Sequence, residues 1–146
     1  MKINTKYHGE LEIMEQDLVE FPKGIPGFLE EKKFVLVPFS EDGMFQILQS
    51  VKTEVLAFVV TNPFLFIQDY DFKLEQSTVE LLEIENREDV LTYVILTVHE
   101  QFQETTANLQ GPIVINVNKR IGKQVILTGT SYETKHKLFA QLQPTE

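Results

Sequence analysis

The sequence of 146 residues contains no cysteine and no tryptophan. Without cysteine the chain cannot form a disulfide, a thiolate metal site or a thiol nucleophile. Its three histidines, His8, His99 and His136, are far apart, and none belongs to an H-x-H or H-E-x-x-H pattern. Because histidine metal sites use such spacings, the sequence predicts neither a metal ion nor another cofactor.

The motifs of common enzyme classes are also missing. The sequence has no G-x-S-x-G, no P-loop and no G-x-G-x-x-G. His99 and Glu100 are a conceivable acid/base pair, but an ordinary strand end explains them better. We therefore expect a protein that is not an enzyme. The alternative, a small enzyme using scattered carboxylates, would need a concave pocket that perturbs those groups.

Long apolar segments are absent too. The N-terminus, Met1–Asn4, lacks the apolar core of a secretory signal. The longest apolar runs, Val55–Val60 and Val90–Val98, are far shorter than the roughly 20 residues that cross a bilayer. We therefore expect a cytoplasmic protein that does not engage a membrane.

The apolar residues that are present recur mainly with a period of two, which is typical of β-strands. Short alternating or β-branched runs predict a hairpin of strands 3–7 and 11–13 and further strands over 34–39, 45–48, 55–60, 64–70, 90–98, 113–118 and 124–127. The run 90–98 is apolar on both faces, so it should be central and covered on both sides.

Helical signals are few. Ser77 and Glu80 match a capping box, which predicts one helix that ends near Asn86, and a short helical turn could lie over 27–31. No linker, repeat or low-complexity segment divides the chain, so residues 1–146 should form a single domain. The predicted fold is mainly β, a small antiparallel β-barrel with one or two short helices.

The charge of the chain is unevenly distributed. From Asp69 to Glu104 there are ten acidic residues against two basic ones, a balance of −8 out of a total of −9. Such a stretch favours cationic partners and repels nucleic acid. A slight basic excess after Thr105 is too small for strong binding to a polyphosphate. A barrel that binds nucleic acid directly remains an alternative, and gel shifts on RNA would test it.

Six short segments of the sequence follow one another along the chain, and three of them, at 24–28, 62–64 and 106–116, have unusual backbone or amide requirements. They are Gly24-Ile25-Pro26-Gly27-Phe28, Leu48-Gln49-Ser50, Asn62-Pro63-Phe64, Asp69-Tyr70, Thr106-Ala107-Asn108-Leu109 with Pro112-Ile113-Val114-Ile115-Asn116, and Gly122-Lys123-Gln124. Together they resemble the FliW family of bacterial flagellar assembly factors, and the resemblance covers the whole domain. One departure is Gly111, where this family is expected to have Ala.

The resemblance implies a protein-binding regulator. Members of this family bind CsrA, a small basic RNA-binding dimer that represses translation of flagellin messenger RNA, and they also bind flagellin. Accumulated flagellin would occupy such a protein and leave CsrA free to repress translation. Secretion of flagellin would release the protein, which would then disable CsrA. A chaperone for flagellin alone, with no role in translation, is the alternative.

Charge and aromatic placement suggest which residues make these contacts. We assign contact with CsrA to the acidic residues Asp69, Asp71, Glu83, Glu85, Glu88 and Asp89. Three aromatic residues beside this stretch are the predicted apolar anchors: Phe64, Phe66 and Tyr70. Exposed aromatic side chains there would supply the apolar contact that the helix-forming ends of flagellin require.

Overall fold

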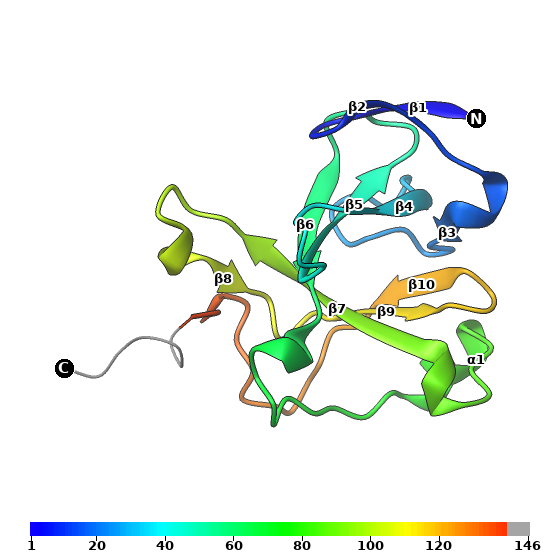
Figure 1. The fold of residues 1–146 in the computed structure, drawn as a ribbon. Helices are drawn as coiled ribbons and strands as arrows, with labels where there is room; N and C mark the ends of the chain where they lie inside the picture. Colours follow the sequence, from blue (N-terminus) through cyan, green and yellow to red (C-terminus); the bar gives the residue numbers. More distant parts are fainter. Residues whose placement is uncertain (140–146) are drawn as a thin grey trace.

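A closed barrel of seven strands forms the centre of the molecule (Figure 1). The computed structural model describes residues 1–139. The strands of the described part are β1 (Lys2–Thr5), β2 (Gly9–Glu12), β3 (Leu18–Glu20), β4 (Lys33–Pro38), β5 (Phe45–Ser50), β6 (Ala57–Thr61), β7 (Val90–Thr97), β8 (Thr106–Ala107), β9 (Ile113–Asn116), β10 (Ile121–Gln124) and β11 (His136–Lys137).

The barrel runs in the order β7-β6-β5-β4-β3-β10-β9 and closes where β9 pairs with β7. All of these pairs are antiparallel except one: β10 lies parallel to β3 through a single pair, Ile121 opposite Glu20. The predicted mainly β barrel is therefore confirmed, and its purely antiparallel character is corrected at this closing pair. The predicted hairpin over 113–127 is present, although its second strand begins earlier, at Ile121.

The barrel interior is filled by aromatic and branched side chains. Phe21 packs edge-on against Phe34, with ring centroids 5.4 Å apart, and both are fully buried. Gly122 leaves room for this pair, because a Cβ atom there would lie 2.8 Å from the ring of Phe21. The glycine of β10 is thus needed for close packing inside the barrel.

The predicted N-terminal hairpin is confirmed as β1 and β2, which pack beside the barrel (Figure 1). Ile3 and Ile13 are buried against Val35 of β4. Gln49 joins the two parts, since its side-chain oxygen accepts a hydrogen bond from the Lys6 amide at 3.0 Å, and its nitrogen donates to backbone carbonyls. A buried amide requires such partners.

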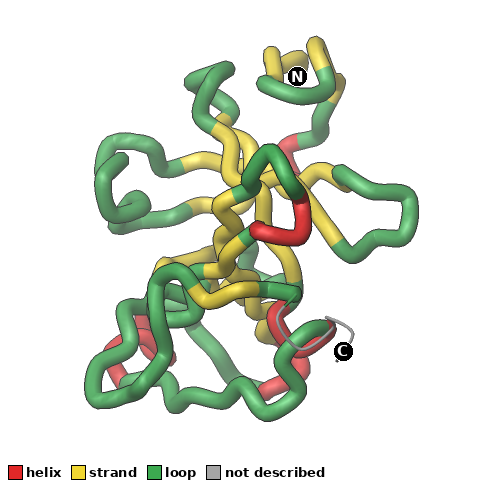
Figure 2. Tube along the Cα trace, turned by 90° about the vertical axis from the view of Figure 1, so that its left-hand side faces the viewer, coloured by secondary structure: helices red, strands yellow, loops and turns green. Residues whose placement is uncertain are grey.

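Strand β7 is central, as predicted, because it pairs with β6, β8 and β9. Its coverage is incomplete, however: Leu91 in the strand and Val98 directly after it are exposed. Beyond the barrel its end pairs with β8, and β8 pairs with β11 near the C-terminal end of the described chain. Figure 2 shows most of the strands in the middle of the molecule, with long loops extending from them and the N-terminal hairpin at the top.

The segment between β6 and β7 differs most from the prediction. The expected strand over 64–70 is wrong: Pro63–Leu65 forms a 3₁₀ helix, followed by turns. Helix α1 (Gln76–Leu81) exists but is shorter than predicted, and it is preceded by Glu75 in place of the predicted cap Ser77. The helical turn expected over 27–31 is reduced to a single hydrogen-bonded turn, in which the Glu31 amide donates to the Phe28 carbonyl at 3.0 Å, next to an isolated β-bridge between Ile25 and Phe28. No helix in residues 1–139 is long and apolar enough to span a membrane.

Candidate functional site

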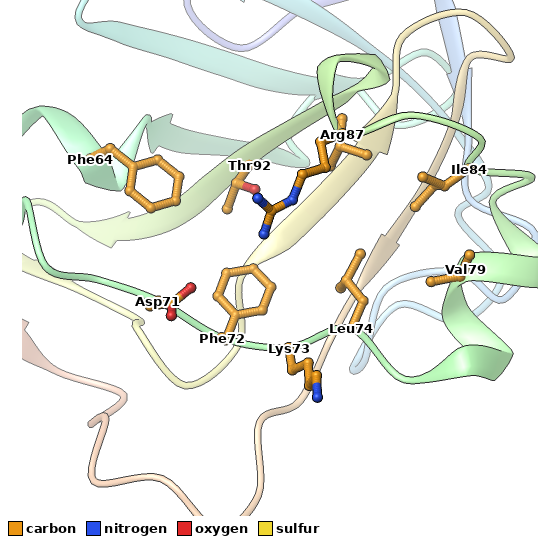
Figure 3. A pocket seen from close by; sticks show the side chains of 10 residues that line it. Phe64, Asp71, Phe72, Lys73, Leu74, Val79, Ile84, Arg87 and Thr92 are labelled. Carbon is orange, nitrogen blue, oxygen red and sulfur yellow. The ribbon is translucent and has the colours of Figure 1, made fainter.

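A hollow of about 410 Å³ lies between the 3₁₀ helix Pro63–Leu65, helix α1 and the start of β7 (Figure 3). Its apolar lining comes from Phe64, Phe72, Leu74, Val79, Ile84 and Val90. Its polar lining comes from Asp71, Lys73, Arg87 and Thr92. Volumes in this range are typical of ligand-binding sites.

The sequence around Asn62 sets one wall of the hollow. The Asn62 side chain accepts a hydrogen bond from the Phe64 amide at 2.9 Å, and Pro63 occupies the first helical position. This is a side-chain cap with proline at the position that helices favour. The result places the ring of Phe64 at the edge of the hollow, where it is 43% exposed. Phe64 therefore fits the predicted role of an exposed apolar anchor.

The end of helix α1 forms the opposite wall. The Ile84 amide donates to the Val79 carbonyl at 3.0 Å, and Glu83 between them adopts a positive φ of 53°. This i to i−5 bond with a left-handed residue is a Schellman motif, in which the residues at its two ends commonly make an apolar contact. Val79 and Ile84 both line the hollow.

Asn116 fixes the acidic loop that follows this helix. Its side-chain nitrogen donates to the carbonyls of Leu82 at 2.8 Å and Glu83 at 3.1 Å, and its oxygen accepts from the Asn118 amide. Asn116 is fully buried at the end of β9. The barrel therefore holds the backbone of the loop in one position.

One of the predicted acidic residues lines the hollow, and four others are next to lining residues in the sequence. Asp71 lines it, Glu83 and Glu85 flank the lining residue Ile84, and Glu88 and Asp89 lie between the lining residues Arg87 and Val90. Asp69 lies two residues before Asp71. All are exposed except Asp89, which is half-buried and accepts a hydrogen bond from Asn118 at 2.6 Å. We call these six carboxylates the acidic rim.

Two of the predicted anchors are not available at the surface. Phe66 is only 7% exposed and packs against Phe45 and Phe139, with ring centroids 5.9 and 5.7 Å away. Tyr70 is 3% exposed, and its hydroxyl donates to the Leu109 carbonyl. The expectation that Phe66 and Tyr70 are exposed is therefore wrong, because both belong to the core beside the barrel.

Tyr70 nevertheless helps to hold the loop that carries Asp71 in place. Burial raises the pKa of its phenol, and neighbouring Tyr132 raises it further, so the hydroxyl keeps its proton and donates a hydrogen bond to the Leu109 carbonyl. The Tyr132 oxygen in turn accepts from the Asp71 amide at 2.9 Å. The two tyrosines, 4.7 Å apart between ring centroids, thus hold the backbone that carries Asp71 and Phe72.

The charge count of the sequence did not identify Arg87 and Lys73 as site residues. They are the only basic residues between Asp69 and Glu104, and both line the hollow. Figure 3 shows the Arg87 guanidinium reaching into the space between Thr92 and Phe72. Within residues 1–139, no three His, Asp or Glu side chains are arranged to hold a metal ion.

Comparisons with known proteins agree on one family. The family model described as "FliW protein" matches residues 2–138. A flagellar assembly factor FliW of a Geobacillus species (strain WCH70) is 60% identical over 141 residues, which are 97% of each chain. The one of Bacillus subtilis (strain 168) is 51% identical over 138 residues, covering 94% of this chain and 96% of the relative.

A solved structure gives the same result for the fold. The crystal structure of a flagellar assembly factor FliW superimposes with a TM-score of 0.90 at 57% sequence identity. The match covers 94% of this chain and 96% of that one.

Proposed function

Because this chain belongs to the FliW family of flagellar assembly factors, we propose that it regulates flagellin synthesis by binding the translational repressor CsrA. In this proposal the protein acts in the cytoplasm, as a single domain that works through its surface and not through catalysis. Bound CsrA is disabled, and flagellin competes by sequestering the protein. When flagellin has been secreted, the protein is released to act on CsrA.

The observation that carries the CsrA proposal is the acidic rim. Six carboxylates lie within 21 residues of sequence, of which Asp71 lines the hollow and four are next to lining residues in the chain, and no more than two of the six are engaged by basic or amide side chains in residues 1–139: Glu83 with Lys119 at 3.9 Å, and Asp89 with Asn118. A surface on which most carboxylates are unpaired attracts a cationic RNA-binding dimer and raises the rate of encounter.

Antagonism of CsrA needs more than contact. The protein weakens RNA binding by CsrA only if its affinity differs between RNA-free and RNA-bound CsrA. An acidic surface supplies such a difference, because bound RNA neutralises the positive charge that the rim would otherwise meet.

A pull-down with both candidate partners tests the proposal. The full chain is immobilised and offered purified CsrA and flagellin, first separately and then together. We expect each to be retained alone and flagellin to reduce the amount of CsrA retained. Retention of flagellin without CsrA would instead indicate a chaperone with no role in translation. A shift of bare RNA by the protein alone would support the nucleic-acid-binding alternative.

A further inference from the structure

The chain beyond β10 continues as an extended edge that no strand of residues 1–139 covers. The amides of Val125 and Leu127 each donate to a carbonyl of the segment before β9, both at 2.8 Å, so the hairpin of β9 and β10 extends beyond its strands. Because main-chain groups of an extended chain alternate in direction, those of Ile126 and Thr128 point away from this partner. Within residues 1–139 no hydrogen bond engages the main chain of either residue. We call residues 124–128 the open edge.

A proline explains why this edge is open. Strand β3 pairs with β10 only through Glu20 and Ile121, where the Glu20 amide donates to the Arg120 carbonyl at 2.9 Å. In a parallel ladder the next amide from the β3 side would be that of residue 22, and Pro22 has none. The pairing therefore stops at the start of β10, and the chain beyond it is left without a neighbour on that side.

A second, smaller hollow of about 240 Å³ lies beside the open edge. Its lining comes from Phe72, Lys73 and Glu75 before helix α1 and from residues 125–128 and Thr130. The residues that bond to the open edge from the β9 side do not line it, so the smaller hollow lies toward the unpaired side. Ile126 is 53% exposed there. An occupant of this hollow would meet unpaired main-chain groups together with an apolar side chain.

We propose that the open edge binds an extended peptide segment of a partner protein, which adds to the sheet as one more strand. The main-chain amides and carbonyls of the segment pair with those of Ile126 and Thr128. Every second side chain of the segment lies on the same face as Ile126, and apolar side chains fit that face. Strand addition of this kind takes its affinity from main-chain hydrogen bonds and its specificity from alternate side chains.

The main chain selects this occupant, and charge does not. The charged residues that line the smaller hollow are Lys73 and Glu75, one of each sign, so they favour neither a cationic nor an anionic segment. A helix uses its main-chain groups internally and has none left for Ile126 and Thr128. An extended segment offers such groups along one edge at every second residue, which is the spacing of these two residues. The inference goes beyond the proposed binding of CsrA and does not depend on it.

Nuclear magnetic resonance on the ¹⁵N-labelled full chain tests this inference. The probe is the peptide acetyl-Lys-Thr-Val-Thr-Val-Thr-Glu-amide, which has strong β-propensity and no net charge. We expect saturable shifts at the amides of Ile126 and Thr128. Hydrogen exchange of these two amides should slow by about tenfold or more at saturation. The amides of Val125 and Leu127 are already bonded and should change less.

Two methylated peptides separate main-chain pairing from side-chain contact. In one peptide the amides of the three threonines carry methyl groups, and in the other the amides of the two valines do. Residues of a strand direct their amides alternately to its two edges, so only one of these peptides loses donors that face the protein. That peptide should bind about tenfold more weakly than the other, because several hydrogen bonds are lost together.

A proline variant of the protein makes the reciprocal test. Ile126→Pro removes the unpaired amide without breaking a hydrogen bond of residues 1–139, and it should abolish the saturable shifts at Thr128. Asn4→Pro is the matched control. Asn4 lies in β1, and its amide points away from β2, the only strand that β1 pairs with in residues 1–139. Proline is tolerated at such edge positions, so this variant should bind the peptide like the native chain.

Each outcome decides for or against the open edge. Equal weakening by the two methylations, or shifts that avoid Ile126 and Thr128, would overturn the inference, and these measurements need no variant that might fail to fold. Equal loss of binding in Ile126→Pro and Asn4→Pro would also overturn it. If the same amides shift with protein concentration alone and sedimentation shows a dimer, a second copy of the chain covers the edge and the inference is wrong. None of these results involves CsrA, so failure of this site and failure of the proposed function are distinguishable.

Discussion

The hydroxyl of Tyr70 donates a hydrogen bond of 2.6 Å to the carbonyl oxygen of Leu109, 39 residues further along the chain. This bond is buried and joins the loop that carries Asp71 to the segment between β8 and β9. A residue that charge and sequence position predict as a surface anchor is therefore a structural support of the site.

Replacing Tyr70 by Phe should destabilise the protein while leaving its shape intact. The change leaves the Leu109 carbonyl buried without this partner, which costs about 1–3 kcal/mol. Urea unfolding measures the difference. Tyr7→Phe is the matched control, because Tyr7 is 44% exposed and its change should stay within about 0.5 kcal/mol. Equal stabilities of the two variants would contradict a structural role for the Tyr70 hydroxyl.

The hydrogen bonds of Glu31 should make the stability of the protein depend on pH. Its carboxylate accepts from the hydroxyls of Ser50 at 2.6 Å and Thr53 at 2.9 Å. The bond from Ser50 is the main cause that lowers the pKa of Glu31 below its ordinary value of 4.5, against a smaller opposing effect of burial. A lowered pKa adds stability above pH 4.5, and this contribution is lost as the pH falls through the folded-state pKa.

The native chain should therefore be more stable than Glu31→Gln at pH 7, by up to about 1 kcal/mol because the group is partly exposed. The difference should shrink below pH 4.5, since glutamine does not titrate. Unfolding free energies of both chains from pH 3 to 7 measure it. Glu30→Gln, at an exposed neighbour, should show no such trend. A difference that stays constant with pH would contradict this role of Glu31.

The two glycines around Pro26 should differ in their tolerance of alanine. Both have a positive φ, 68° at Gly24 and 90° at Gly27. A Cβ atom on Gly24 would overlap the backbone of Leu29, with the Leu29 Cα atom 2.6 Å away, whereas one on Gly27 meets nothing within 4 Å.

Gly27→Ala should therefore lose only about 1–2 kcal/mol of stability, which is the cost of the backbone strain that a Cβ atom introduces at a positive φ. Gly24→Ala should lower the free energy of unfolding by about 1–3 kcal/mol more, because the Leu29 backbone must move. Thermal unfolding of the two variants side by side measures the gap. If Gly27→Ala were the less stable of the two, the tight turn would not be the reason for glycine at position 24.

The strands of the barrel could be predicted from sequence because each follows a local rule. Short runs of β-branched or aromatic residues mark β4, β5 and β6, and their order in the chain is also their order in the sheet. The closing contact could not be predicted in this way. Ile121 and Glu20 pair across about a hundred residues, and nothing near either of them specifies a parallel neighbour.

The segment before β7 was harder for a different reason. Phe64, Phe66 and Tyr70 have the spacing of one strand face, but Pro63 and the Asn62 cap start a 3₁₀ helix instead. Helix α1 ends early because Glu83 adopts a left-handed conformation that usually requires glycine or asparagine. A glutamate gives no sequence signal for that end.

The acidic rim was predictable, and the cation within it was not. Counting charges between Asp69 and Glu104 finds the excess of carboxylates, but the same count treats Arg87 as a small correction. Arg87 matters because of the direction of its side chain, which the folded chain turns toward Phe72 and Thr92. Such directions depend on tertiary packing.

The association rate of CsrA with the full chain at low and high salt tests the central claim most directly. Rates would be compared for the native chain, for Asp69→Lys with Asp71→Lys, and for Glu10→Lys with Glu15→Lys, which makes the same change of charge in the N-terminal part. We expect the rim variant to associate about tenfold more slowly at low salt. The control should slow association less, and the differences should vanish at high salt.

Equal rates for the native chain and the rim variant at low salt would contradict the claim that the acidic rim binds CsrA.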